Sequence, residues 1–164
     1  MNKLDLNPIF AEIKSSWEMP DNTSIECAKS IVKKLSESLE LKHFLAKEEI
    51  TKGKELYRDH ERGFVLIAYS EPKDFYRVPH NHGNSWVVYA VIEGIIEMGT
   101  YTLANQNHLI KKDKYQMESG DTQVYFPGDI HDTKCISEKV IILRFTSCDL
   151  REEEKQGRMK KFKV

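Results

Sequence analysis

From about residue 62 to residue 146 the chain is a succession of short runs rich in β-branched and aromatic residues. The runs are 64–69, 86–92, 95–102, 108–111, 115–117, 122–126 and 140–146. Turn-forming residues separate many of them, as at Glu93-Gly94 and Pro127-Gly128-Asp129. Many short strands at this spacing indicate a mainly β fold, either a sandwich or a barrel.

The first 60 residues have a helical pattern instead. One apolar stripe with a period near 3.6 residues consists of Ile25, Ala28, Ile31, Val32, Leu35 and Leu39. A second helix is predicted over 43–57, although Gly53 lies within it. We therefore expect a helical segment over 1–60 that packs on a β-barrel over 61–150. A charged tail follows over 151–164, with six basic and three acidic residues, and we expect it to be solvated.

Charge and composition restrict the partners of the chain. The 164 residues contain 25 Lys and Arg against 26 Asp and Glu, so the net charge is −1. This balance gives no electrostatic footprint for nucleic acid or for an anionic membrane surface. The longest apolar run is 86–92, whereas a membrane helix needs roughly 20 apolar residues. We expect neither nucleic acid nor a membrane as a partner.

The cysteines indicate a reducing compartment. Cys27, Cys135 and Cys148 are widely spaced, odd in number and form no CxxC pair. This pattern is not that of a disulfide framework, and reduced thiols are typical of the cytosol. The N-terminus has no apolar segment of signal-peptide length. A cytoplasmic protein is the prediction.

Three of the six histidines lie in positions suited to metal binding. His80 and His82 flank Asn81 just before one predicted strand, and His131 follows another. Residues i and i+2 of a strand face the same side, so an extended HxH segment places two imidazoles together. A third imidazole from a neighbouring strand would complete a set of three nitrogen ligands with an open side. An HxH pair by itself also occurs by chance on a solvated strand edge.

The spacing around these histidines resembles the two signature motifs of the cupin superfamily. The first motif runs from His80-Asn81-His82 to Gly94, and the second runs from Gly120 through Pro127-Gly128 to His131. The resemblance implies a cupin double-stranded β-helix, a jelly-roll barrel, with the helices at its N-terminus. It implies that His80, His82 and His131 bind a metal ion.

Within the cupins, the chain resembles the cysteine dioxygenase or thiol dioxygenase group over about residues 55–147. The position of the usual glutamate ligand is Val87, and three histidines without a carboxylate are typical of that group. The order of 56–58, the strand 64–69, 79–86 and Glu93-Gly94 is also similar. The resemblance implies Fe(II) as the metal and Arg58 as the group that holds a substrate carboxylate.

Two departures from that group concern the inner face of the barrel. Val87 replaces the cysteine that forms a crosslink in mammalian-type enzymes. The Ser-x-His-x-Tyr relay is replaced by Ile142, Arg144 and Thr146. If these three residues face inward, then Arg144 needs an anionic partner in an apolar barrel, either a substrate carboxylate or a protein carboxylate such as Asp132. Tyr89 has the strand phase of Val87 and is a further candidate, as a catalytic group or as a packed aromatic.

These observations lead to a mononuclear non-haem iron dioxygenase as the first functional hypothesis. It would act on a small thiol carboxylate or another chelating acid, with a small anionic substrate and dioxygen as partners. One alternative is a metal-binding cupin without redox chemistry that binds a small ligand. Another is a Zn or Mn hydrolase, lyase or isomerase, and Ni is a further metal to consider. Cupins often dimerise through sheet edges, so a homodimer stays open.

Overall fold

The computed structural model describes residues 4–17, 22–105 and 108–163. Within them the helices are α1 (Asn7–Ser16), α2 (Asn22–Glu37), α3 (Leu39–Leu45) and α4 (Leu150–Lys155). The strands are β1 (Lys54–Arg58), β2 (Val65–Pro72), β3 (Tyr76–His80), β4 (Val87–Glu93), β5 (Ile95–Asn105), β6 (His108–Glu118), β7 (Thr122–Tyr125), β8 (Ile130–Cys135) and β9 (Lys139–Thr146). None of the helices in these ranges is both long and apolar enough to cross a lipid bilayer.

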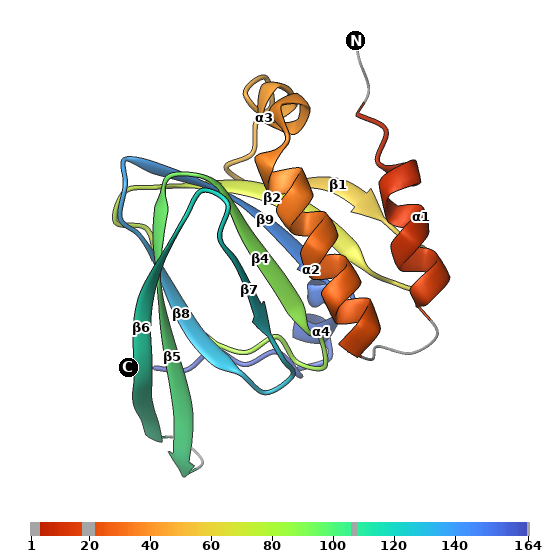
Figure 1. Cartoon of the computed structure of the whole chain (residues 1–164). Coiled ribbons are helices and arrows are strands. Elements are labelled where there is room, and N and C mark those ends of the chain that lie inside the picture. Colours follow the sequence, from red (N-terminus) through yellow and green to blue (C-terminus); the bar gives the residue numbers. More distant parts are fainter. Residues whose placement is uncertain (1–3, 18–21, 106–107, 164) are drawn as a thin grey trace.

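Two antiparallel sheets face each other, and the N-terminal helices cover one of them (Figure 1). The five-stranded sheet has the order β1-β2-β9-β4-β7, and the four-stranded sheet has the order β3-β8-β5-β6. Sheets built from hairpins and crossovers of this kind bury alternate residues on the inner face. The prediction of a mainly β fold with N-terminal helices is confirmed.

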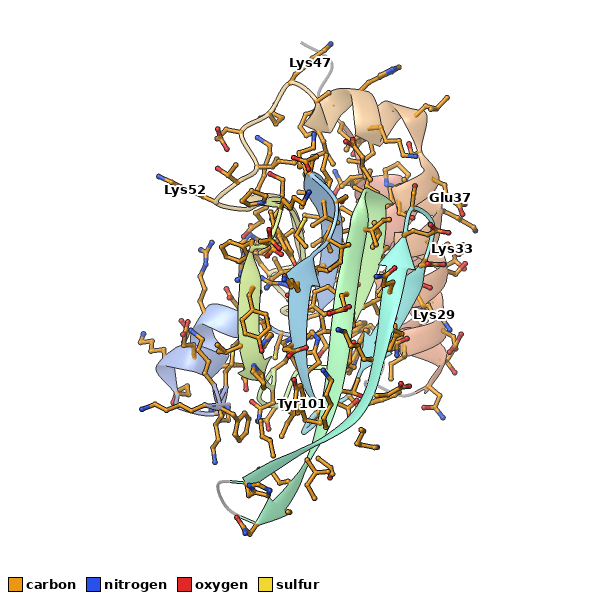
Figure 2. The ribbon with its side chains drawn as sticks, turned by 90° about the vertical axis from the view of Figure 1, so that its left-hand side faces the viewer. Lys29, Lys33, Glu37, Lys47, Lys52 and Tyr101 are labelled. Atoms are coloured by element: carbon orange, nitrogen blue, oxygen red, sulfur yellow. The ribbon has the colours of Figure 1, made fainter. Side chains whose placement is uncertain are left out.

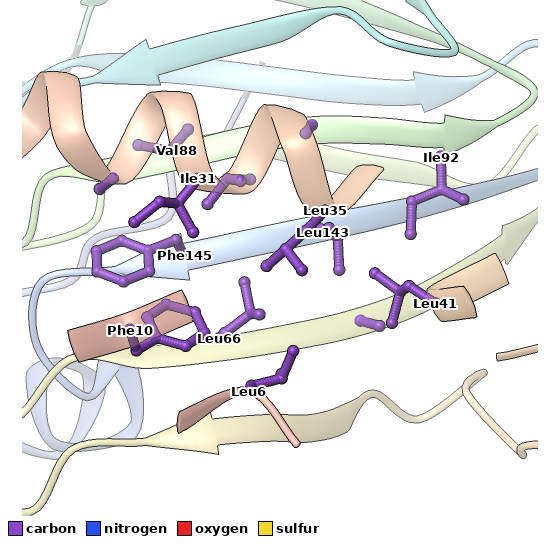
Figure 3. Close-up of a cluster of buried hydrophobic side chains, with 14 of the residues drawn as sticks. Leu6, Phe10, Ile31, Leu35, Leu41, Leu66, Val88, Ile92, Leu143 and Phe145 are labelled. Carbon is purple, nitrogen blue, oxygen red and sulfur yellow. The ribbon is translucent and has the colours of Figure 1, made fainter. Parts of the chain in front are cut away.

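Two apolar clusters lie on opposite faces of the five-stranded sheet. The cluster beneath the helices includes Phe10, Leu143 and Phe145, and Figure 3 shows it in close-up. The cluster between the sheets includes Val87 and Ile142. Successive residues of β9 therefore alternate between the clusters, as strand geometry requires. This alternation confirms the predicted phase, with Leu143 and Phe145 facing the helices and Ile142 facing inward.

Helix α2 follows the predicted stripe closely. Ile25, Ala28, Ile31, Val32 and Leu35 are buried against the sheet. Figure 2 shows Lys29, Lys33 and Glu37 along the outer side of the helix, and Lys33 pairs with Glu37 at 3.1 Å. The helix ends at Glu37, because Ser38 caps α3 by accepting a hydrogen bond from the Leu41 N–H. Leu39 is consequently 71% exposed and does not belong to the stripe.

The predicted helix over 43–57 is wrong. Helix α3 ends at Leu45, and β1 begins at Lys54, inside the segment that was expected to be helical. Gly53 has a φ of +83°, a left-handed backbone conformation that a continuous helix over 43–57 could not contain, and β1 begins at the next residue. Good helix propensities here are outweighed by antiparallel pairing of β1 with β2. The sheet thus starts before residue 61.

The C-terminal residues are packed on the barrel rather than solvated along their whole length. Helix α4 follows β9, and its Glu153 is only 4% exposed. After the helix, Lys161 forms an isolated antiparallel bridge with His80. The Phe162 N–H also donates to the Pro79 carbonyl at 2.8 Å. The segment therefore continues the β3 edge of the four-stranded sheet.

Candidate metal centre

The three candidate histidines are brought together by strand pairing. His80 is the last residue of β3 and lies opposite His131 of β8 in the antiparallel register. His82 follows two residues later, in the turn that leads to β4. One ligand nitrogen from each ring lies within 4.8 Å of those of the other two. The structure thus assembles the predicted group from two strands and a turn.

The ring separations suit a single ion. His82 Nε2 and His131 Nε2 are 3.3 Å apart, and the ring centroids of the three residues are 4.6–5.1 Å apart. Two nitrogen ligands about 2.1 Å from one metal ion are about 3.0–3.4 Å apart at octahedral or tetrahedral angles. The observed nitrogen separation lies in this range.

Hydrogen bonding directs the His80 ring toward the group. His80 Nδ1 lies 2.8 Å from the Val78 carbonyl oxygen. A carbonyl only accepts, so Nδ1 carries the proton and Nε2 keeps a free lone pair. A metal-binding histidine commonly has its other nitrogen fixed by a backbone carbonyl in this way. This contact therefore orients His80 as a ligand.

All three imidazoles are neutral at neutral pH. Burial lowers the pKa of His80, and it holds the pKa of His82 and His131 well below the usual value. The positive charge of Arg144 lowers each of them further. Neutral imidazole is the form that binds metal ions, so the group needs little deprotonation to bind one.

The donor set fits a metal ion with open coordination positions. The group contains three nitrogens, and the described residues add no carboxylate to it. Val87, at the position of the usual cupin glutamate, is fully buried in the apolar cluster between the sheets. Three imidazoles suit Fe(II), Zn, Mn or Ni and leave coordination positions for other ligands.

Two tyrosines flank the histidines. The Tyr89 hydroxyl lies 3.1 Å from His82 Nε2, and burial raises the pKa of Tyr89, which keeps it a phenol. The Tyr125 ring stacks on His131 with centroids 4.0 Å apart, and its hydroxyl lies 2.5 Å from the Tyr115 hydroxyl. Tyr89 is therefore a protonated hydroxyl at the metal-binding group, whereas Tyr125 packs one ligand ring in place.

A cavity of about 420 Å³ reaches His80 of this group. Its lining includes His80, Tyr89, Tyr69 and Arg144, and Tyr89 also contacts His82 behind it. His82 and His131 are fully buried behind the cavity wall. A small molecule in the cavity would therefore contact His80 and Tyr89, with His82 and His131 directly behind them.

Arg144 points into the cavity without a carboxylate partner. Its guanidinium carbon lies 5.6 Å from the centroid of the Tyr69 ring. No Asp or Glu among the described residues forms an ion pair with it, and its buried Nε has no hydrogen-bond partner there. Asp132 instead accepts hydrogen bonds from the hydroxyls of Tyr76 and Tyr101. The structure thus rejects Asp132 as the partner of Arg144.

Arg58 does not lie at the cavity. It is held by two carboxylates, with Nη2 2.7 Å from Glu55 Oε2 and Nη1 2.7 Å from Asp149 Oδ2. Asp149 in turn caps α4 through the Arg151 N–H. Arg58 thus ties β1 to α4 and does not line the cavity that contains His80 and Arg144.

The sequence did not identify several residues that line the cavity. Arg77 lines it and pairs with the buried Glu71. Leu150, Arg151, Glu154, Met159 and Lys161 come from the C-terminal segment. The sequence carried no local signal for these residues, because only the path of the chain after β9 brings them to the cavity.

Comparisons with known proteins support the fold. No family model matches the chain, and no curated protein matches it. Among solved structures, the chain is similar to the Schizosaccharomyces pombe Cnp3 cupin domain, with a TM-score of 0.53 and 13% identity over 69% of this chain and 77% of that one. It also matches KdgF from Halomonas sp. (TM-score 0.49, 14% identity, 61% of this chain and 82% of that one). An oxalate oxidase in complex with glycolate matches with a TM-score of 0.45 and 16% identity, over 52% of this chain and 42% of that one.

The chain therefore has the cupin fold, and the predicted fold class is confirmed. At 13% identity the likeness to the Cnp3 cupin domain establishes the fold alone, and the chemistry has to be inferred from the site. The site consists of three neutral imidazoles, one of which lines a cavity together with the guanidinium of Arg144, which has no carboxylate partner among the described residues.

Proposed function

We propose that the protein is a mononuclear non-haem iron(II) dioxygenase that acts on a small thiol carboxylate or another small chelating acid. The observation that carries this proposal is that Arg144 and His80, one member of the three-histidine group, line the same cavity. A cation without a carboxylate partner in a partly buried cavity favours an anionic ligand. A metal ion with open coordination positions near Arg144 favours an acid that also chelates the metal.

Each residue of the cavity has a separate task in this proposal. His80, His82 and His131 hold the ion, and Arg144 orients the substrate carboxylate in bidentate geometry. The Tyr89 hydroxyl, 3.1 Å from His82 Nε2, would donate a hydrogen bond to a bound substrate. The apolar cluster that contains Val87 excludes water from this end of the barrel.

The bound iron(II) would supply the redox chemistry that activates dioxygen. The chain itself supplies orientation, a dry cavity and a fixed positive charge. The residues at the positions of the thiol dioxygenase relay are Ile142, Arg144 and Thr146, which cannot form that relay, and the Tyr89 hydroxyl lies 3.1 Å from His82 Nε2. Chelating acids other than thiols therefore belong among the substrates to test.

A second candidate is a zinc or manganese enzyme with hydrolase, lyase or isomerase chemistry. The specific observation in its favour is the neutral phenol of Tyr89 beside the ligand group. A hydroxyl in this position can transfer a proton to or from a bound substrate without any redox step.

Metal analysis and oxygen uptake distinguish the two candidates. The protein is purified without added metal, its metal content is measured, and iron-loaded protein is tested with a panel of thiols and small carboxylic acids in an oxygen electrode. We expect oxygen uptake that requires both iron and one of the acids. Zinc or manganese as the bound metal, together with no uptake by the iron-loaded protein, would contradict the dioxygenase and support the second candidate.

A further inference from the structure

The turn that carries His82 is held from outside the barrel by the C-terminal segment. The Asn84 N–H donates to Glu153 Oε2 at 2.9 Å, and Asn84 lies two residues after His82. The Glu153 carboxylate also accepts two hydrogen bonds from Arg158, at 2.9 and 2.8 Å. A buried carboxylate thus joins the histidine turn to the residues that follow α4.

The residue between the two histidines is fixed by the same segment. The Asn81 N–H donates to the Lys160 carbonyl at 3.0 Å, and the Lys160 N–H donates to Asn81 Oδ1 at 2.9 Å. On the other side, His80 pairs with His131 of β8, after an irregularity in the β3–β8 register between Arg77 and His80. The backbone around the ligands is therefore held on one side by β8 and on the other side by residues 158–162.

The contact between Glu153 and this turn is close. Gly83 has a φ of +61°, and a Cβ there would lie 2.3 Å from Glu153 Oε2. The carboxylate therefore rests directly on the backbone between His82 and Asn84. A side chain in such a position limits how far the turn can move.

We propose that Glu153 is a positioning residue for the metal-binding group and acts through the turn of residues 82–84. It contacts no ligand nitrogen; it fixes the backbone from which His82 projects. The inference rests on the proposed metal site but does not depend on which metal or reaction the protein uses. Residues that orient ligands in this indirect way commonly change metal affinity by about 10-fold to 100-fold when they are replaced.

The test compares Glu153→Ala and Glu153→Gln with the control Glu152→Gln, which changes the neighbouring exposed carboxylate of the same helix. The readouts are the Kd for Zn²⁺ by chelator competition, the Tm of the metal-free protein, and the visible spectrum of the Co²⁺-loaded protein. We expect Glu153→Ala to raise the Kd about 10-fold or more and to alter the Co²⁺ spectrum, with partial recovery in Glu153→Gln. Glu152→Gln should match the wild type.

A lower metal-free Tm with an unchanged Kd and an unchanged Co²⁺ spectrum would show that Glu153 only stabilises the fold, and it would overturn the proposal. If the Glu153 variants do not fold, the Kd of Arg158→Met for Zn²⁺ tests the proposal instead. It leaves the carboxylate in contact with Asn84 but removes two hydrogen bonds that hold it. A rise in Kd of about 3-fold or more supports the proposal, and an unchanged Kd overturns it.

A second inference rests on the charges of the cavity and not on the turn. Four cationic side chains line the cavity: Arg77, Arg144, Arg151 and Lys161. Arg77 pairs with Glu71 and Lys161 with Glu154. Arg144 and Arg151 form no ion pair with the described carboxylates, and both also line an adjoining cavity of about 240 Å³. Two guanidiniums that form no ion pair with the described carboxylates therefore face the same space, one half-buried and one exposed, and the nearest negative charges around Arg151 are those of Glu55 and Asp149.

We infer that the ligand carries two acid groups, one for Arg144 and one for Arg151. The inference rests on the proposed function, because it names the substrate class of the same cavity. Each guanidinium can hold a carboxylate in bidentate geometry. A ligand with one acid group would contact Arg144 alone and would gain nothing from the charge of Arg151.

Calorimetric titration of metal-loaded protein with succinate and with butyrate tests this inference. We expect succinate to bind about 10-fold more tightly, and Arg151→Met to abolish the difference while the butyrate Kd stays within about 2-fold. Lys155→Met, at the end of the same helix, is the control for general charge. Equal binding of the two acids, or a preference for succinate that persists in Arg151→Met, would overturn the inference of a ligand with two acid groups. The metal content of the same samples shows separately whether the histidine site is intact.

Discussion

His80 and His131 face each other across the β3–β8 ladder, and their ring centroids are 4.6 Å apart. Direct cross-strand neighbours have Cβ atoms only about 4.5–5.5 Å apart, so this pairing brings two distant ligands together before any metal binds. His82 then needs only the turn after β3 to join them. The metal-binding group is therefore a consequence of strand register, and register is set by the buried faces of the two sheets.

The first prediction concerns His131. Replacing it with Ala removes one of three nitrogen ligands and leaves a two-coordinate remnant, so metal content should fall from about one ion per chain to nearly none. Inductively coupled plasma analysis of purified protein measures this. The matched control is His60→Ala, since His60 is exposed and lies outside the group. Full metal content in the His131 variant would refute the ligand assignment.

The second prediction separates the two arginines. Arg144→Met should weaken binding of a small carboxylate by about 10-fold to 100-fold, because a charge-assisted bidentate contact is lost. Metal content should not change. Arg58→Met should leave carboxylate affinity within about 2-fold, since Arg58 is held by Glu55 and Asp149 away from the cavity. The reverse result, measured by titration calorimetry, would restore Arg58 as the anchor.

The different outcomes for these two arginines show what the sequence could predict. Arg144 was found through the resemblance to the relay positions, with its inward direction left conditional, and the structure meets that condition because successive residues of β9 face opposite sides of the sheet. Arg58 was assigned by resemblance alone. Its actual contacts depend on Asp149, which lies far along the chain and shows no local pattern.

The same reasoning applies to the elements that were missed. Strand β8 has the polar sequence Ile-His-Asp-Thr-Lys-Cys, yet most of it is buried. Its polar groups are satisfied by partners on other strands, as when Asp132 accepts hydrogen bonds from Tyr76, Tyr101 and the Gly99 N–H. Such long-range compensation cannot be read from hydrophobic periodicity. The packed C-terminal segment was missed for a similar reason.

The third prediction concerns pH. Hydrogen bonds from Arg158, and from the Asn84 N–H, lower the pKa of Glu153 to about 2 from an ordinary value of 4.5. The folded protein therefore holds this carboxylate ionised after the unfolded chain has taken up a proton. The stabilisation is complete above pH 4.5 and is lost as the pH falls toward 2.

Urea unfolding of wild type and Glu153→Gln at several pH values measures this contribution. The difference in free energy of unfolding should be on the order of 2 kcal/mol at pH 7, allowing for the exposed Arg158, and should disappear near pH 2. Glu152→Gln serves as the control, with a small difference at every pH. A Glu153 effect that does not depend on pH would show that the charge of the carboxylate is unimportant.

The last prediction compares two glycines that share a backbone conformation. Gly83 and Gly63 have φ values of +61° and +84°, so an alanine at either position is strained by about 1–2 kcal/mol. At Gly63 a Cβ would meet nothing within 4 Å, whereas at Gly83 it would overlap Glu153 Oε2 and crowd Arg158 Cβ at 3.2 Å. Gly83→Ala must therefore displace the carboxylate from the histidine turn.

We expect Gly83→Ala to lower the free energy of unfolding by about 3 kcal/mol and Gly63→Ala by about 1 kcal/mol. Chemical unfolding measures both, and zinc affinity should fall in the Gly83 variant alone. Equal destabilisation with equal zinc affinity would mean that Glu153 moves aside freely and that the turn is not held by the C-terminal segment.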